Sequence, residues 1–168
     1  MASRHLVIIG NGVAGTTAAQ AARQTDPLAR ITLIGNEPLP YYYRSSLTEW
    51  ITGELVGKTI IARTERFYHD MQIEQGSGIV THVQPEACML RFADGQEMHY
   101  DALCIATGAR SNIIPFKGLA EDRICTYRSI TDAELIKARL QDQPSVLIVG
   151  GGVLGLELAG GLKRMGLP

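Results

Sequence analysis

The sequence predicts an α/β protein in which a doubly wound, mostly parallel sheet carries an inserted antiparallel β-meander and is followed by the start of a second such unit. Three observations predict this fold. The aliphatic run Leu6–Ile9 leads directly into the glycine-rich turn Gly10–Gly15, GNGVAG. The same arrangement recurs where a second expected strand, Val146–Val149, leads into Gly150–Gly155, GGGVLG. Between these motifs, short stretches of alternating apolar and polar residues are typical of an antiparallel sheet.

The three glycines of the first turn each have a physical reason. Gly10 permits the tight turn out of the strand, Gly12 lets the backbone approach a pyrophosphate, and Gly15 lets the next helix pack closely on the strand. We expect that helix at 14–23, and the N–H groups at its start, around Val13 and Ala14, suit phosphate. The turn therefore predicts a dinucleotide site.

A second apolar strand is expected at Ile31–Ile34, which completes a mononucleotide-binding half of a doubly wound sheet. In such a unit an acidic residue at the tip of the second strand binds a ribose, about 20 residues beyond the glycines. Glu37 occupies this place, directly after Asn36. The alternative is that Glu37 is an ordinary solvated loop residue.

The next segment, 38–54, is too aromatic for an ordinary linker. Tyr41–Tyr43 and Trp50 are expected mainly to pack the edge of the domain. Arg44 is different, because a planar guanidinium both binds a diphosphate in a bidentate manner and stacks on an electron-rich ring.

The middle of the chain predicts a short helix at 64–71 and then the meander. Asp94-Gly95 is a strong hairpin signal within the meander. The meander is expected from about Ile73 to Tyr100, in the stretches Ile73–Glu74, Gly78–Val83, Met89–Phe92 and Glu97–Tyr100. A buried strand at Ala102–Ala106 follows the meander and ends in Thr107-Gly108.

The C-terminal part predicts two helices. The first begins at Thr131, with Thr131 as N-cap and Glu134 as its capping-box partner, and runs to about Gln141. The second, at 154–165, follows the second glycine turn. We expect a first domain at 1–116 and the start of a second at 117–168.

The composition of the chain argues against several classes of function. With 45% apolar residues and a net charge of −1, the chain has no electrostatic case for nucleic acid. The aliphatic runs are far shorter than the roughly 20 residues of a membrane span, and no export signal precedes the first strand. Three cysteines without Cys-x-x-Cys and four histidines without ligand spacing favour a reducing cytoplasm and no metal site.

These motifs together resemble the FAD- and NAD(P)-dependent pyridine-nucleotide reductases with two dinucleotide-binding domains. The resemblance covers essentially the whole chain, and the segment Tyr100–Ala109, YDALCIATGA, between two glycine motifs is its most specific part. It implies a Rossmann-like FAD-binding domain and the start of a Rossmann-like NAD(P)-binding unit. By this resemblance FAD would be held by Gly10, Gly12, Gly15, Glu37, the backbone of Val80, Ala106, Thr107 and Gly108, and NAD(P)H by Gly150, Gly152 and Gly155.

Within this family the segment after the second strand distinguishes the branches. The disulfide-reducing branch carries Cys-x₄-Cys there, whereas this chain has Arg44–Thr48, RSSLT, which excludes a redox-active disulfide. The pattern YYYRSSLTEWITGE resembles rubredoxin and ferredoxin reductases, apoptosis-inducing factor and, most closely, the FAD module of assimilatory nitrite reductase large subunits. Arg44 would then contact FAD.

Two positions depart from the family pattern. The ribose-binding acid would fall on Asn36 by strict counting, so Glu37 has to reach from one residue later. Where the ferredoxin-reductase branch often has a lysine, this chain has Glu49, opposite Glu157 of the second motif. Two close carboxylates raise one pKa, so Glu157 is a positioning candidate and no residue is a certain catalytic one.

We therefore expect the N-terminal portion of an FAD-dependent NAD(P)H oxidoreductase. Hydride would pass from NAD(P)H to FAD, and electrons would pass singly to an iron–sulfur, rubredoxin-like or haem-type acceptor, either a protein or a downstream redox domain. The 168-residue chain alone is expected to be inactive and to self-associate. The alternatives are a nucleotide-binding or redox-sensing interaction protein and an inert fragment without cofactor.

Overall fold

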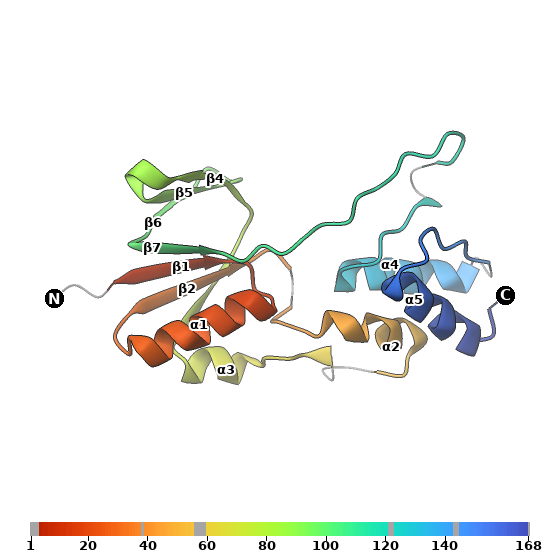
Figure 1. Cartoon of the computed structure of the whole chain (residues 1–168), viewed down its shortest axis with the longest axis horizontal. Coiled ribbons are helices and arrows are strands. Elements are labelled where there is room, and N and C mark those ends of the chain that lie inside the picture. Colours follow the sequence, from red (N-terminus) through yellow and green to blue (C-terminus); the bar gives the residue numbers. More distant parts are fainter. Residues whose placement is uncertain (1–3, 38, 56–59, 121–122, 143–144, 168) are drawn as a thin grey trace. The chain divides into compact units, whose positions relative to one another are not determined.

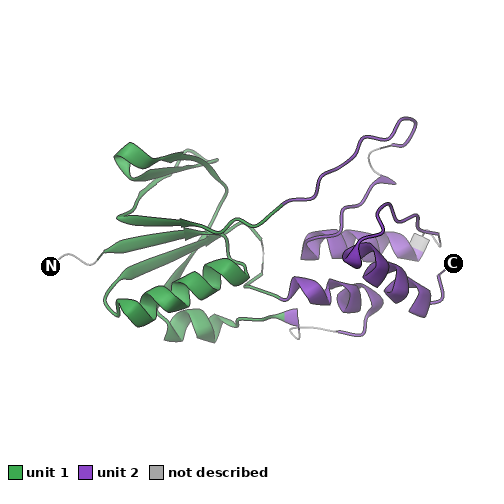
Figure 2. Ribbon diagram, in the orientation of Figure 1, with its two compact units in different colours: residues 1–42, 61–109 green, residues 43–60, 110–168 purple. Residues whose placement is uncertain are grey.

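The structure is a computed structural model that describes residues 4–37, 39–55, 60–120, 123–142 and 145–167. The chain divides into two compact units, which Figure 2 shows in different colours. Unit 1 comprises residues 1–42 and 61–109, and unit 2 comprises residues 43–60 and 110–168. The segment 43–60 and residues 110–116 are thus grouped with the C-terminal helices in unit 2. The functional division at residue 116 stays a prediction, since it concerns which nucleotide each part serves.

Unit 1 is built on a four-stranded parallel sheet with the strand order β3-β2-β1-β7 (Figure 1). Its strands are β1 (His5–Ile9), β2 (Arg30–Gly35), β3 (Ile73–Ser77) and β7 (Ala102–Ile105). Strand β1 lies between β2 and β7, so both of its edges are paired, and its side chains Val7 and Ile8 are fully buried. This confirms the prediction of a parallel sheet arranged around the first aliphatic run.

One face of the sheet is covered by the helices α1 (Val13–Thr25) and α3 (Glu65–Asp70), which Figure 1 shows side by side beneath the strands. The apolar positions of these helices meet the inward-facing residues of the strands. The resulting core contains Ile8, Ala19, Ile31, Leu33, Tyr68 and Ile73.

The other face of the sheet carries the antiparallel meander of β4 (Val80–Gln84), β5 (Met89–Phe92) and β6 (Glu97–His99), with the 3₁₀ turn η3 (Pro85–Ala87) between the first two. Leu90 of the meander is buried against Val7 and Ile34 of the parallel sheet. The predicted start of the meander was wrong. Ile73–Glu74 belongs to β3, which pairs in parallel with β2, and the turn at Gly78, with φ +147°, separates it from β4.

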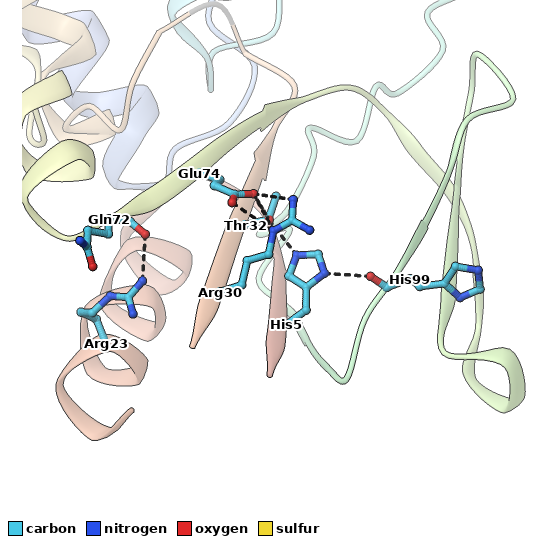
Figure 3. Close-up of polar contacts among 7 residues, drawn as sticks. All are labelled: His5, Arg23, Arg30, Thr32, Gln72, Glu74 and His99. Atoms are coloured by element: carbon cyan, nitrogen blue, oxygen red, sulfur yellow. Dashed lines mark hydrogen bonds and ion pairs between the residues drawn. The ribbon is translucent and has the colours of Figure 1, made fainter. Parts of the chain in front are cut away.

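A polar network ties the amino ends of β1 and β2 to β3 and to the meander (Figure 3). The ring of His5 lies 3.0 Å from the carbonyl oxygen of His99 through Nδ1 and 2.8 Å from Thr32 Oγ1 through Nε2. Arg30 donates from Nε and Nη2 to the carboxylate of Glu74 at 2.9 to 3.0 Å. Arg30 therefore holds the pKa of Glu74 below its ordinary value.

Arg23, near the end of α1, fixes the chain around it through its guanidinium. It donates to the backbone carbonyls of Met71 and Gln72, at 2.8 and 2.9 Å, and to those of Pro27 and Ala29, both at 2.8 Å. The contact with Gln72 is drawn in Figure 3. One planar donor group thus joins the end of α1, the loop before β2 and the loop before β3.

Unit 2 contains the 3₁₀ turn η1 (Arg44–Ser46) and the helices α2 (Leu47–Thr52), α4 (Ile130–Asp142) and α5 (Val153–Arg164). Helix α2 packs on both of the others. A Cβ at Gly161 of α5 would lie only 2.5 Å from the Thr48 side chain, so this glycine lets the two helices approach closely. The sequence analysis did not predict α2.

Two predictions for unit 2 were wrong in detail. Residues 146–149 are not in a strand, because none of the described residues pairs with them and a lone parallel strand has no ladder partner. The capping box of α4 also lies two residues earlier than predicted. The N–H of Asp132 donates to Ser129 Oγ at 3.1 Å, and the N–H of Ser129 donates to Asp132 Oδ2 at 2.9 Å.

The helices of the described residues fall short of the dimensions of a bilayer. None of them combines the length and the apolar character that spanning a membrane requires.

Candidate functional site

The first glycine turn lies at the carboxyl end of β1 and is tightly packed at two of its glycines. At Gly10, with φ +116°, a Cβ would lie 2.1 Å from the carbonyl oxygen of Ala106. At Gly15 it would lie 1.8 Å from the carbonyl oxygen of Gly10. At Gly12, by contrast, nothing lies within 4 Å of the Cβ position. Of the three glycines, two are therefore closed off by the protein itself, and at Gly12 a ligand can approach the backbone.

Helix α1 begins directly at this open position. Gly12 is its N-cap, and the first intrahelical bond runs from the N–H of Thr16 to the carbonyl of Gly12 at 3.0 Å. The N–H groups of Val13, Ala14 and Gly15 precede this bond and have no partner within the helix. Together with the positive end of the helix dipole they form an anion-binding group beside the open face of Gly12.

A pocket of about 160 Å³ lies beside the turn, at the carboxyl ends of β2 and β3. Ligands of open α/β sheets bind at this end of the strands. Its polar walls include the side chains of Asn11 and Glu37. The other lining residues are Gly35, Leu39, Pro40, Glu65, Gln75, Gly76 and Ser77.

Glu37 and Asn36, the two candidates for ribose binding, have different surroundings. Glu37 is half-buried in the pocket wall, and its carboxylate accepts a hydrogen bond from the hydroxyl of Tyr42. Tyr42 itself is only 3% exposed, so its hydroxyl is held in place. Asn36 is exposed and does not line the pocket. The geometry therefore favours Glu37.

The ATG segment, Ala106–Gly108, meets the first glycine turn. The N–H of Ala106 donates to the carbonyl of Ile9 at 2.8 Å, and the carbonyl of Ala106 faces Gly10. Thr107 and Gly108 follow at the surface, and Gly108 adopts φ +68°. Val80, the first residue of β4, is half-buried and packs against the core beneath the meander. Two motifs far apart in sequence are thus joined at the end of β1.

The second glycine turn, in unit 2, repeats the geometry of the first. Gly150 has φ +124°, and a Cβ at Gly155 would lie 2.3 Å from the carbonyl oxygen of Gly150. At Gly152, the N-cap of α5, nothing lies within 4 Å of the Cβ position. The two glycine turns therefore resemble each other in backbone geometry as well as in sequence, although the residues before the second turn are not in a strand.

Arg44 also belongs to unit 2. Its Nη1 donates to the carbonyl of Arg128 at 2.9 Å, which joins η1 to the segment before α4. The guanidinium is half-buried and fixed in direction by this bond.

Besides burial, the negative charges of Glu157 and Glu49 both raise the pKa of one phenol in unit 2, that of Tyr127. The hydroxyl of Tyr127 lies 2.6 Å from Thr48 Oγ1. Burial raises the pKa of Tyr127, and the charges of Glu157 and Glu49 raise it further. Glu157 is exposed, whereas Glu49 Oε2 is buried and has no hydrogen-bond partner in the described part of the chain. The two acids that the sequence placed opposite each other thus share a neighbourhood.

Sequence reasoning missed three residues, namely Asn11 and Tyr42 of this site and Tyr68, whose hydroxyl donates to Asn11 Oδ1 at 2.8 Å. The signal for Asn11 was its place between two motif glycines. The two tyrosines carried no signal, since their roles depend on partners far along the chain. Among the described residues no three or more histidine, cysteine or acidic side chains are grouped to hold a metal ion.

These groups fit a dinucleotide. An open backbone at Gly12, a row of N–H groups for a diphosphate and a pocket with a carboxylate for a sugar hydroxyl lie next to one another in unit 1. Sites of this kind occur in several families and serve several dinucleotides.

Curated proteins with similar sequences are electron-transfer reductases. The chain is 35% identical over 98% of its length to the ferredoxin–NAD⁺ reductase subunit of the benzene 1,2-dioxygenase system of Pseudomonas putida, and spans 40% of that protein. It is 32% identical over 96% of its length to a rubredoxin–NAD⁺ reductase of Pseudomonas putida, of which it spans 42%. The chain thus spans about two fifths of these relatives.

Solved structures agree with the sequence relatives. The NADH:rubredoxin oxidoreductase of Clostridium acetobutylicum superposes with a TM-score of 0.88 at 28% identity, over 99% of this chain and 43% of that one. A ferredoxin reductase of Rhodopseudomonas palustris gives 0.89 at 28% identity, over 98% and 41%. The family model described as pyridine nucleotide-disulphide oxidoreductase matches residues 4–167. The chain therefore belongs to the pyridine nucleotide-disulphide oxidoreductase family.

Proposed function

We propose that the protein is part of an FAD-dependent oxidoreductase that takes hydride from NAD(P)H onto FAD and passes electrons singly to a ferredoxin-like or rubredoxin-like acceptor. The observation that carries this proposal is the first glycine turn, in which Gly12 is the open one of the three glycines, with the pocket of Glu37 beside it. Similarity to ferredoxin and rubredoxin reductases supports FAD at the first motif and NAD(P)H at the second.

Several groups of the chain would hold the first cofactor. The N–H groups of Val13, Ala14 and Gly15 bind its diphosphate, and Glu37 accepts hydrogen bonds from its adenosine ribose. The chemistry supplied by FAD, when bound, is acceptance of a hydride and release of electrons one at a time. The backbone of Val80 would contact the adenine of the cofactor. The segment from Ala106 to Gly108 covers the cofactor, and the guanidinium of Arg44 contacts it.

The second motif would hold the hydride donor. The turn of Gly150, Gly152 and Gly155 offers N–H groups to the diphosphate of NAD(P)H. Glu157 follows it on α5 and orients the donor rather than transferring a proton. In this division residues 1–116 serve FAD and residues 117–168 begin the NAD(P)H domain.

We place this reductase in the cytoplasm, with a soluble redox protein or a downstream redox domain as its acceptor. The cysteines Cys88, Cys104 and Cys125 are all free thiols, which supports a reducing compartment. The test of location is fractionation of cells that carry the protein. Recovery in an oxidising compartment, with any of these thiols in a disulfide, would contradict it.

We further propose that the 168-residue chain self-associates through unit 2. Leu147 is 88% exposed, and Val149, Val153 and Leu156 are each more than 60% exposed. Such a group of apolar side chains lowers its free energy by being covered. Sedimentation should show a concentration-dependent oligomer that Leu147→Ser weakens. The matched control is Leu28→Ser, at an 83% exposed position of unit 1, which should leave the oligomer unchanged.

The cofactor proposal is tested by titrating the chain with FAD and with NAD⁺ and following flavin fluorescence and heat. FAD should bind more tightly than NAD⁺ to unit 1. Chemically reduced FAD on the chain should then reduce an added ferredoxin or rubredoxin, seen as bleaching of the acceptor. Tighter binding of NAD⁺ at the first motif, or reduction no faster than by free reduced FAD, would contradict the proposal.

A further inference from the structure

A buried tyrosine hydroxyl controls the side chain that stands between the first two glycines of the turn. Tyr68 of α3 is 1% exposed, and its hydroxyl donates to Asn11 Oδ1 at 2.8 Å. The same hydroxyl oxygen accepts the N–H of Tyr41 at 3.1 Å. Asn11 is therefore linked to α3 and to the segment that leads to Tyr42.

The single proton of the Tyr68 hydroxyl fixes the orientation of the Asn11 amide. A phenol has one proton to donate, and burial raises the pKa of Tyr68, so the proton stays on the hydroxyl. With Tyr41 already donating to this oxygen, the phenol proton needs an acceptor, which Asn11 Oδ1 supplies. A flipped amide would present Nδ2–H₂ to the phenol and leave a buried donor without this acceptor, at a substantial cost. The amide is thus held in one orientation.

In this orientation the amide nitrogen lies near Gly35, which also lines the pocket. A Cβ at Gly35 would lie 3.1 Å from Asn11 Cβ and 3.8 Å from Nδ2, so the amide lies against the end of β2. Asn11, Gly35 and Glu37 all line the same pocket. Tyr42 holds the carboxylate of Glu37 in the same wall. Two buried hydroxyls thus set one donor and one acceptor in a single pocket.

We propose that Tyr68 is a positioning residue of the dinucleotide site, which acts through Asn11 by directing the Asn11 Nδ2–H₂ group at an oxygen of the adenosine diphosphate part of the ligand. This inference rests on the proposed function and adds a donor that pairs with the acceptor Glu37. The ligand oxygen belongs either to the ribose or to the diphosphate, and both are hydrogen-bond acceptors.

A double-mutant cycle on ligand affinity tests the proposal. ADP and FAD are titrated into the wild-type chain, Tyr68→Phe, Asn11→Ala and the double variant, with thermal unfolding measured in parallel. Tyr68→Phe should weaken ADP binding about 3-fold to 15-fold, which corresponds to one lost hydrogen bond. In the Asn11→Ala background the same change should have no further effect on ADP affinity, because the amide through which Tyr68 is proposed to act is gone.

The matched control is Tyr42→Phe, which removes a buried hydroxyl from the same pocket but acts through Glu37. Its effect on ADP affinity should be the same in the wild-type chain and in the Asn11→Ala background. A second readout needs no variant: in wild-type protein the Asn11 side-chain amide resonances should shift and exchange more slowly with water when ADP is added. Adenosine in place of ADP identifies the acceptor, since the ribose is present in both and the diphosphate only in ADP.

The outcomes separate this inference from the proposed function. If FAD binds but Tyr68→Phe is as harmful in the Asn11→Ala background as in the wild-type chain, Tyr68 has only a structural role and the inference fails alone. Amide resonances that do not respond to ADP would overturn it as well. If the wild-type chain binds neither FAD nor ADP, both the inference and the proposed cofactor are wrong.

Discussion

At the residue scale, two glycines of the first turn are needed for different reasons. The fold requires a glycine at position 15, and the proposed ligand requires one at position 12. An alanine at Gly15 would place its methyl group 1.8 Å from the carbonyl oxygen of Gly10, so the turn and α1 would have to move apart. An alanine at Gly12 meets nothing within 4 Å, and φ −113° at this position is accessible to any residue. Its methyl group would instead occupy the path of a diphosphate.

We therefore expect Gly15→Ala to lower the free energy of unfolding by about 3 kcal/mol or more, the upper range for overpacking. Gly12→Ala should leave unfolding nearly unchanged but abolish measurable FAD binding. Thermal unfolding and FAD titration of both variants check this. Tight FAD binding by Gly12→Ala would place the cofactor elsewhere.

The pocket predicts a second effect at this scale. Glu37→Ala should weaken FAD binding by about 1–3 kcal/mol, because the ribose hydroxyls and the buried hydroxyl of Tyr42 would lose their acceptor. Asn36→Ala is the matched control, since Asn36 is exposed and lies outside the pocket wall. Isothermal titration of both variants measures the difference. A larger loss in Asn36→Ala than in Glu37→Ala would reverse the assignment.

At the scale of elements, the start of α4 depends on an ionised side chain. Burial tends to raise the pKa of Asp132, but hydrogen bonds from Ser129, Thr126 and Arg128 favour its carboxylate, and the net effect lowers the pKa. A lowered pKa in the folded state stabilises the fold above the unfolded pKa of about 4. This contribution is lost as the pH falls through the lower folded value.

Asp132→Asn should accordingly lower the free energy of unfolding of unit 2 by about 1 kcal/mol at pH 7, a typical loss for a helix cap. The difference from wild type should shrink as the pH falls below about 4. Urea unfolding followed by circular dichroism at several pH values measures it. Glu134→Gln, at an exposed position of α4, should show no such dependence. If the difference in unfolding free energy between wild type and Asp132→Asn grew as the pH fell, the predicted direction of the pH dependence would be wrong.

Elements with a strong local pattern were predictable from sequence, and elements held by distant partners were not. Strands β1 and β2 read as aliphatic runs because helices cover one of their faces and the meander covers the other. Strand β7 is also aliphatic, but it is an edge strand with Ala102 and Ile105 exposed, so the prediction of a buried strand there was wrong in its burial. Strand β3 was assigned to the meander because, as an edge strand, it buries only Ile73 and exposes Glu74 and Gln75. The short helix α2 is stabilised by packing on α4 and α5, which no local pattern reports.

The same distinction applies to the site. The glycine turn, Glu37 and the ATG segment could be located because each carries its chemistry in its own residues. The bonds of Tyr68 with Asn11 and of Tyr42 with Glu37 depend on how the backbone folds. Tyrosine in an aromatic segment is also common as packing, so nothing in the sequence distinguished these two.

At the scale of the whole molecule, we expect slow flavin reduction by NADH and NADPH in the 168-residue chain. Residues 146–149 before the second glycine turn are not in a strand, so that turn lacks the sheet that would hold it. Hydride transfer requires reacting atoms about 3–3.5 Å apart, and a displacement of roughly 1 Å costs about 10²-fold in rate. Stopped-flow mixing of the FAD-saturated chain with each nucleotide checks this. Rapid bleaching in a monomer would show that the second site is assembled.

The division into units also has a consequence for synthesis on the ribosome. Unit 1 can close once residue 109 has emerged, since both of its segments are then complete. Helix α2, made much earlier, packs on α4 and α5, which emerge last. During this interval the apolar side chains of Leu47 and Ile51, which are buried in the finished fold, have no helix to cover them. Helix α2 is therefore the segment of the nascent chain that a chaperone would bind, until residues 130–164 release it.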